Sequence, residues 1–170
     1  LNNEVSGKIY KFKWIEIEGF TANIGIDLNE ASIGMMIVVT LIGTLVHLFS
    51  LSYMAKDEGK GRYFACLSLF MFSMTGIVLA DNLVMMFIFW ELVGVSSYLL
   101  IGHYFTKDSA PEAAKKAFLV NRIGDFGFII GILMLWSVCG GMLNIAELES
   151  FVRSNPEAFG AGFLTIATLC

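Results

Sequence analysis

From residue 31 onward, long apolar segments alternate with short polar turns. The residues before 31 follow a different pattern. Over residues 8–28 apolar and polar side chains alternate in two runs, with a break at 19–23, which predicts a short β-hairpin. Four apolar segments follow at 31–54, 63–80, 83–105 and 109–139, and each approaches or exceeds the ~20 residues that cross a bilayer. The run from Phe163 to Cys170 predicts the start of a fifth span.

Local signals indicate where the later helices begin and end. Ser109 and Glu112 have the spacing of a capping box at the start of the fourth span, and two glycines at 140–141 end it. A short helix is then expected to rest on the membrane surface as far as Pro156. Asn144 can cap it, and three apolar residues share one of its faces: Ile145, Leu148 and Val152.

Composition agrees with an all-α polytopic membrane protein. Hydrophobic residues make up 56% of the chain and charged residues only 15%, against about 25% in soluble domains. The net charge of −4 leaves no basic surface for nucleic acid. We expect an extramembrane hairpin segment at 1–30 and a helical bundle at 31–170. Because the chain opens on Leu1 and stops inside an apolar run, the bundle is expected to be part of a longer domain.

The charges of the turns predict an orientation. The turns at 55–62 and 106–116 each carry three basic and two acidic residues, whereas 140–157 carries one basic and three acidic residues. Successive spans place the two lysine-bearing turns on one side, which the positive-inside rule makes cytoplasmic. The hairpin belongs on the opposite surface, since an open sheet edge cannot lie in lipid.

Three charged residues interrupt the apolar spans. A charge at the centre of a spanning helix costs about 2.5–3.5 kcal/mol, so Glu91 is a candidate proton-binding residue, although a structural carboxylate is the alternative. Arg122 and Asp125 are three residues apart and share a face of the fourth helix. A rise of about 1.5 Å per residue places Arg122 at a depth similar to that of Glu91, so the two can meet. A purely structural interhelical pair is equally consistent with the spacing.

Two further residues are weaker candidates. His47, inside the first span, can relay protons or hydrogen-bond a neighbouring helix. Lys115 shares a stripe with Arg122 and could take part in conduction, although snorkelling to the headgroups also explains it. His103 lies at a different depth from His47, so a haem between them is not expected. The sequence contains no phosphate-cradling loop, cysteine cluster or nucleophile–base pair, which predicts no cofactor, no metal and no redox chemistry in this chain.

The stretch from Phe89 to Gly102 resembles the glutamate-bearing helix of the antiporter-like subunits of respiratory complex I, more narrowly subunit 5 or L of NADH:quinone oxidoreductase. Segments 47–54, 79–82 and 116–125 match in the same order, so the resemblance covers roughly residues 10–139. It implies that Glu91 is the proton-channel glutamate, and that Arg122 and Asp125 are the charged pair that helps to couple neighbouring subunits. The lysine that the family pairs with this glutamate would lie beyond Cys170.

The resemblance implies proton translocation driven by NADH oxidation and quinone reduction elsewhere in the complex. The implied partners are the lipid bilayer and other membrane subunits, foremost a neighbouring antiporter-like subunit. The implied location is the bacterial cytoplasmic membrane or an equivalent energy-transducing membrane. Two alternatives remain, namely a subunit of a multisubunit sodium/proton antiporter, which shares the Trp-Glu helix, and a scaffold subunit that transports nothing.

Overall fold

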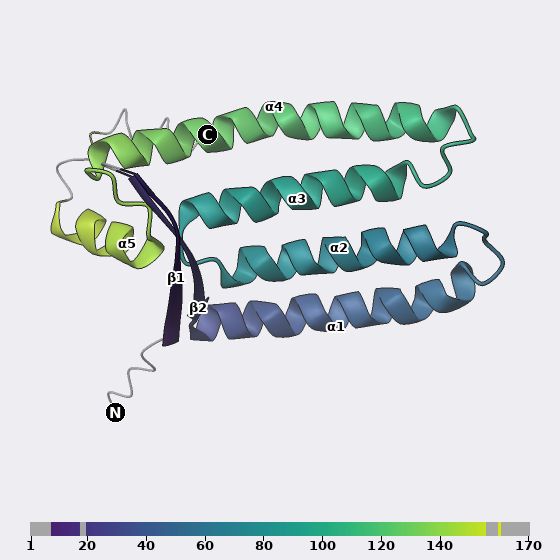
Figure 1. The fold of residues 1–170 in the computed structure, drawn as a ribbon, viewed down its shortest axis with the longest axis horizontal. Helices are drawn as coiled ribbons and strands as arrows, with labels where there is room; N and C mark the ends of the chain where they lie inside the picture. Colours follow the sequence, from purple (N-terminus) through teal and green to yellow (C-terminus); the bar gives the residue numbers. More distant parts are fainter. Residues whose placement is uncertain (1–7, 18–19, 156–159, 161–170) are drawn as a thin grey trace.

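Four long helices lie side by side, each antiparallel to the one before it (Figure 1). The computed structural model describes residues 8–17, 20–155 and 160 of the 170-residue chain. The elements are β1 (Lys8–Ile17), β2 (Phe20–Leu28), α1 (Glu30–Tyr53), α2 (Lys60–Leu79), α3 (Leu83–Ile101), α4 (Ser109–Val138) and α5 (Ile145–Ser154).

The four predicted spans are confirmed, because α1 to α4 are each long and apolar enough to cross a membrane. Each packs against the next along the chain, and small buried residues (Ser50, Ser73 and Ser96) lie where the helices approach one another. The α1–α2 and α3–α4 turns share one end of the bundle, as predicted, with the hairpin and α5 at the other (Figure 1). The predicted fifth span at 163–170 lies outside the described residues.

The third span is shorter than the apolar pattern predicts. Its helix ends at Ile101 with Gly102 as the C-cap, whereas the pattern continues to residue 105. The residues after Gly102 turn back across the end of the bundle, and His103 among them is 6% exposed. The apolar residues beyond Ile101 therefore belong to a packed turn, which hydropathy alone does not distinguish from a span.

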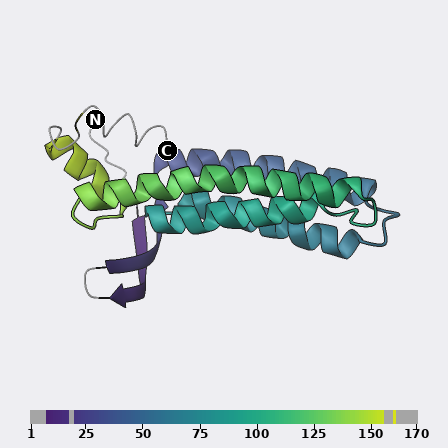
Figure 2. The same cartoon turned by 90° about the horizontal axis from the view of Figure 1, so that it is seen from above.

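The predicted hairpin is confirmed, with β1 and β2 antiparallel and Lys8 paired with Leu28. The alternation of the sequence breaks at 19–23, but β2 already begins at Phe20, and the irregular pairing lies in β1, between Lys13 and Ile15. A bulge shifts the side-chain alternation without ending the strand. Figure 2 shows the hairpin projecting from one end of the helices.

Asparagine side chains start three of the helices. Asn29 accepts from the Ser32 amide at 2.8 Å, Asn82 accepts from the Met85 amide at 2.8 Å, and Asn144 caps α5 as predicted. The capping box predicted at Ser109 is wrong. Asp108 occupies the cap position with helical dihedrals (φ −50°, ψ −34°) and no side-chain cap hydrogen bond. A capping residue needs an extended backbone, whereas Asp108, at the end of the preceding turn, already has a helical one.

Two glycines end α4 as predicted. Gly140 and Gly141 have φ of 63° and 92°, the left-handed region that favours glycine. The Gly141 amide donates to the Trp136 carbonyl at 3.0 Å, which is the long hydrogen bond of a Schellman motif. The chain therefore reverses sharply at this point and returns towards the α2–α3 turn.

Helix α5 packs onto the end of α4 by a different face from the predicted one. Leu148 is buried beside Cys139, and Phe151 packs against the same pair, while Val152 is 41% exposed. Residues three and four positions after Leu148 can both share its helical face. The position of the α4 terminus decides that Phe151 packs there and Val152 does not.

A buried aspartate joins the hairpin, the α2–α3 turn and the start of α5. Asp81 is 2% exposed; its Oδ1 accepts from the Asn82 side chain at 2.6 Å and its Oδ2 accepts from the Asn144 side chain at 3.3 Å. Its carbonyl accepts from the Ile145 amide at 3.0 Å. A Cβ on Gly25 in β2 would lie 1.9 Å from Asp81 Oδ2, so only glycine permits this approach.

We therefore expect Gly25→Ala to destabilise the protein by about 1–3 kcal/mol, the usual cost of overpacking a filled site. The Asp81 side chain is short and held at both oxygens, so it cannot yield cheaply. The measurement is the heat-inactivation temperature of the assembled membrane protein. Gly34→Ala on α1, where a Cβ meets nothing within 4 Å, is the matched control. An equal effect of the two variants would contradict the prediction.

Candidate functional site

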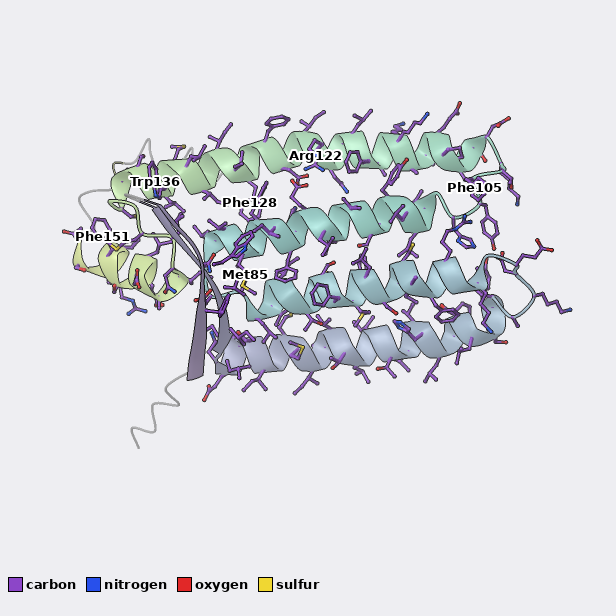
Figure 3. The ribbon with its side chains drawn as sticks, in the orientation of Figure 1. Met85, Phe105, Arg122, Phe128, Trp136 and Phe151 are labelled. Atoms are coloured by element: carbon purple, nitrogen blue, oxygen red, sulfur yellow. The ribbon has the colours of Figure 1, made fainter. Side chains whose placement is uncertain are left out.

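Glu91 and Arg122 meet between α3 and α4. The Arg122 guanidinium donates through Nη1 to Glu91 Oε2, and both residues lie near the middle of their helices. Figure 3 places Arg122 midway along α4, on the side that faces α3. The structure therefore contains the Glu91–Arg122 contact that the similar depth of the two residues allows.

Asp125 and Trp90 complete the arrangement. Asp125 Oδ2 is 3.8 Å from the same Nη1 of Arg122, and the Trp90 indole N–H donates to Asp125 Oδ1 at 3.1 Å. Neighbouring residues of α3 thus hold two residues of α4: Glu91 binds Arg122, and Trp90 binds Asp125. The four side chains form one polar cluster across the α3–α4 interface.

Aromatic rings border this cluster on both sides. The Arg122 guanidinium carbon lies 4.8 Å from the centroid of the Phe118 ring, within the range of a cation–π contact. The Trp90 and Phe128 rings meet edge to face at 5.8 Å, and Phe128 packs in the same way on Phe87 at 5.7 Å. Phe118 thus covers one side of the Arg122 guanidinium, and the Trp90–Phe128 contact lies beside Asp125.

The burial of the three charged side chains is unequal. Asp125 is 12% exposed, Glu91 20% and Arg122 36%. Glu91 Oε1 is buried and has no hydrogen-bond partner among the described residues. An ionised carboxylate oxygen without a donor is costly in an apolar setting, whereas the same oxygen carrying a proton is neutral. The arrangement therefore suits a group that binds and releases a proton.

Two cavities open beside the cluster. One of about 590 Å³ runs between residues of α1, α2, α3 and α4, and another of about 480 Å³ lies between α3 and α4 near Phe128. Trp90, Asn121 and Asp125 line both. Trp90 and Asp125 therefore border space that small molecules or side chains can occupy.

The other two predicted site residues lie apart from this cluster. His47 on α1 donates from Nδ1 to the Gly43 carbonyl at 2.8 Å, so this bond stays within its own helix and does not reach a neighbour. Lys115 is exposed near the start of α4, seven residues and about 10 Å along the helix from Arg122. The structure thus brings Glu91, Arg122 and Asp125 together, and leaves His47 and Lys115 outside.

Sequence reasoning missed Trp90, although a signal was available. An indole N–H inside an apolar span needs an acceptor, and a carboxylate on the next helix at the same depth is the obvious one. It also missed the environment of His103 in the turn after α3. There the His103 Nε2 lies 3.4 Å from Asp57 Oδ1, and Arg62 donates to the His103 carbonyl at 2.8 Å.

Asp57 in the α1–α2 turn has a shifted pKa. Partial burial raises the pKa of Asp57, but hydrogen bonds from the Gly59 amide, His103 and Tyr104 outweigh that effect and leave the pKa below its ordinary value of 3.8. The hydrogen bond from the Gly59 amide to Asp57 Oδ1 is short, at 2.6 Å. The ionised carboxylate therefore tightens this turn.

A group with a lowered folded-state pKa stabilises the fold above its unfolded-state value, and this contribution disappears as the pH falls through the folded-state pKa. We expect the Gly59 amide to stay protected from hydrogen exchange at about pH 4, the usual aspartate pKa, and to lose protection only as the pH falls further through the lowered pKa of Asp57. Exchange of the membrane-embedded protein, corrected for the intrinsic rate, measures this. Asp57→Ala, which removes the acceptor oxygen, should exchange rapidly throughout, while Glu58→Gln, at an exposed neighbour, should behave as the parent. Protection that persists in Asp57→Ala would refute the prediction.

The chain matches two protein families. Residues 14–64 match the family described as NADH-Ubiquinone oxidoreductase (complex I), chain 5 N-terminus. Residues 80–170 match the family described as NADH:quinone oxidoreductase/Mrp antiporter, TM. The second match includes the whole polar cluster.

Relatives and solved structures agree with these matches. The chain is 43% identical to the chloroplastic NAD(P)H-quinone oxidoreductase subunit 5 of Adiantum capillus-veneris over 92% of its length, and 50% identical to NADH-quinone oxidoreductase subunit L of Rhodobacter capsulatus over 88%. It covers 21% of each relative. The fold resembles the Mrp complex from Dietzia sp. DQ12-45-1b with a TM-score of 0.78 at 20% identity, over 96% of this chain and 17% of that one.

The four apolar spans, two of which share an ion pair near their middle, define a multi-pass integral membrane protein. The chain belongs to the NADH:quinone oxidoreductase/Mrp antiporter family of membrane subunits, as the match over 80–170 and the relatives show. The chain spans about a fifth of the length of these relatives.

Proposed function

We propose that this chain is part of an antiporter-like subunit that moves protons across the membrane, and that Glu91 is its proton-binding group. In the proposed setting, the subunit belongs to an NADH:quinone oxidoreductase, and NADH oxidation and quinone reduction in other subunits drive it. The hairpin segment at 1–30 would lie outside the membrane and the bundle from residue 31 within it. The implied partners are other membrane subunits, foremost a neighbouring antiporter-like subunit.

One observation carries the proposal. Glu91 has one oxygen on Arg122 and the other buried without a partner among the described residues, in the middle of a spanning helix. A carboxylate placed only for packing would be expected to use both oxygens. The half-satisfied state instead allows two arrangements: ionised on Arg122, or protonated when Arg122 moves away. Charge movement in the driving subunits would select between them.

Asp125 provides the second position for Arg122 in this mechanism. The guanidinium nitrogen that binds Glu91 is already 3.8 Å from Asp125 Oδ2, so a small rotation exchanges one carboxylate for the other. Because the pair is three residues apart on α4, this exchange needs no movement of the helices. Glu91 would bind a proton when Arg122 leaves and release it when Arg122 returns. Lys115, on the predicted cytoplasmic side, is a candidate group on the approach, and His47 a candidate relay in α1.

A multisubunit sodium/proton antiporter is the second candidate function. The likeness to the Mrp complex and the shared family description favour it, while the relatives named as oxidoreductase subunits favour the first. The two differ in driving force. An antiporter moves protons in response to a sodium gradient without NADH, whereas the proposed subunit acidifies vesicles only while NADH is oxidised.

The experiment that tests the proposal is proton pumping by the complete membrane complex carrying Glu91→Gln, in sealed vesicles with NADH and quinone. Pumping that is lost from a fully assembled complex supports the proposal. Pumping at the parental rate refutes it, and favours a scaffold role for the cluster.

A further inference from the structure

One guanidinium nitrogen of Arg122 faces two carboxylates, and it lies much closer to one of them than to the other. Arg122 Nη1 donates to Glu91 Oε2 but remains 3.8 Å from Asp125 Oδ2, beyond hydrogen-bond distance. Both acids are largely buried, so each benefits from a donor. Asp125 therefore needs a hydrogen-bond donor other than the guanidinium.

This donor is the indole of Trp90. An indole N–H can only donate, and this one lies 3.1 Å from Asp125 Oδ1. A hydrogen bond to an ionised carboxylate is stronger than one between neutral groups. Trp90 thus partly satisfies Asp125 without placing a charge on it.

The indole is held in place by its neighbours. Its ring packs edge to face on Phe128, which packs in turn on Phe87 one turn earlier on α3. Figure 3 shows Phe128 on the side of α4 that faces α3. Trp90 is 49% exposed and lines both cavities beside Asp125, so its ring contact with Phe128 and its hydrogen bond together direct the N–H towards that carboxylate.

We propose that Trp90 is a positioning residue for the Glu91–Arg122 pair: its indole N–H holds Asp125 and so biases Arg122 towards Glu91. The inference rests on the proposed function, in which the sharing of Arg122 sets the protonation of Glu91. Trp90 acts through Asp125 and Arg122 and carries no proton itself.

The charged groups around Glu91 limit what else could set this balance. Arg122 and Asp125 face it from α4. Helix α2, which packs on the other side of α3, carries charge only at Lys60 and Arg62 in its first turn, far from the middle of the bundle. Among these helices, the division of Arg122 between two acids is therefore the dominant local influence on Glu91.

The test is Trp90→Phe in the assembled complex, which removes the N–H and keeps an aromatic ring. Without its neutral donor, Asp125 draws Arg122 away, and the ionised form of Glu91 loses its cation. We expect the ratio of protonated to ionised Glu91 at a given pH to rise about tenfold, as for loss of one charge-assisted hydrogen bond. The readout is the infrared carbonyl band of protonated Glu91, identified by its absence in Glu91→Gln, together with the pH profile of pumping.

Trp136→Phe is the matched control. This indole lies on α4 fourteen residues, or about 21 Å, from Arg122, so its loss should leave the Glu91 band and the pH profile unchanged. A loss of packing alone would lower pumping at every pH without moving the profile. An unshifted band and profile in Trp90→Phe would therefore overturn the inference.

A double variant separates the route of action from the proposed function. If Trp90 acts through Asp125, adding Trp90→Phe to Asp125→Asn should cause no further shift, whereas independent effects would add. Additive shifts would overturn the inference. Normal pumping by Glu91→Gln would refute the proposed function itself. Lost pumping in Glu91→Gln with no shift in Trp90→Phe would refute only the positioning role.

Discussion

The Glu91→Gln variant is expected to assemble and to pump protons at least about a hundredfold more slowly than the parent, since a positioned proton-transfer group typically contributes two to four orders of magnitude. Glutamine preserves the shape and can still accept from Arg122 through its carbonyl oxygen. It removes the one property that the mechanism requires, which is the ability to take up and release a proton. The loss should appear at every pH, because no titrating group remains at this position.

Glu112→Gln is the matched control for that experiment. Glu112 lies exposed in the first turn of α4, so the same chemical change there leaves the mid-bilayer cluster intact. Normal pumping in the control with lost pumping in Glu91→Gln assigns the effect to the position rather than to the loss of a negative charge. Equal rates in the two variants would reject Glu91 as the proton site. Assembly is checked by the quinone reductase activity with NADH, measured in the presence of an uncoupler.

The Arg122→Leu variant is expected to have the second large effect, on stability and on pumping together. It leaves Glu91 and Asp125 without their shared cation, and removing one partner of a buried pair commonly costs 3–5 kcal/mol. Because Arg122 is 36% exposed, we expect about 2–3 kcal/mol here. The heat-inactivation temperature of the assembled complex should fall accordingly, and pumping should be lost.

Two further variants make this second prediction specific. Arg153→Leu removes an arginine that is 78% exposed on α5 and pairs with Glu149, so it should change the stability by less than about 1 kcal/mol. Arg122→Lys keeps the charge but replaces a planar fork with a single point, so stability should largely return while pumping recovers only in part. Full stability in Arg122→Leu would show that the pair contributes nothing.

Much of the polar cluster could be predicted from the chain because a helix converts residue number into depth. With a fixed rise per residue, the positions of Glu91 and Arg122 within their spans placed them at one level, and the contact follows once α3 and α4 are adjacent. The spacing of Arg122 and Asp125 likewise defined a shared face. The roles of these residues in proton transfer remain predictions, since the structure shows their geometry alone.

What the chain could not predict is the direction in which side chains point around each helix. Trp90 and Glu91 are adjacent on α3, and only the rotation and packing of the two helices bring the indole to Asp125 and the carboxylate to Arg122. The same packing decides that Phe151 and not Val152 covers Leu148 in α5. Interhelical geometry depends on many small contacts at once, which no local pattern encodes.

The ends of the elements show the same division between local and tertiary causes. Asn144 and the glycines at 140–141 act through their own backbone neighbourhood, so their roles could be predicted directly. Ser109 failed because the turn before it places Asp108 in a helical conformation, which the capping-box spacing does not reveal. The amino-acid sequence by itself determined four spans, their alternation and the depth of three charges. Only the tertiary structure decided which oxygen meets which donor, because hydrogen bonds require angles and distances that depth does not supply.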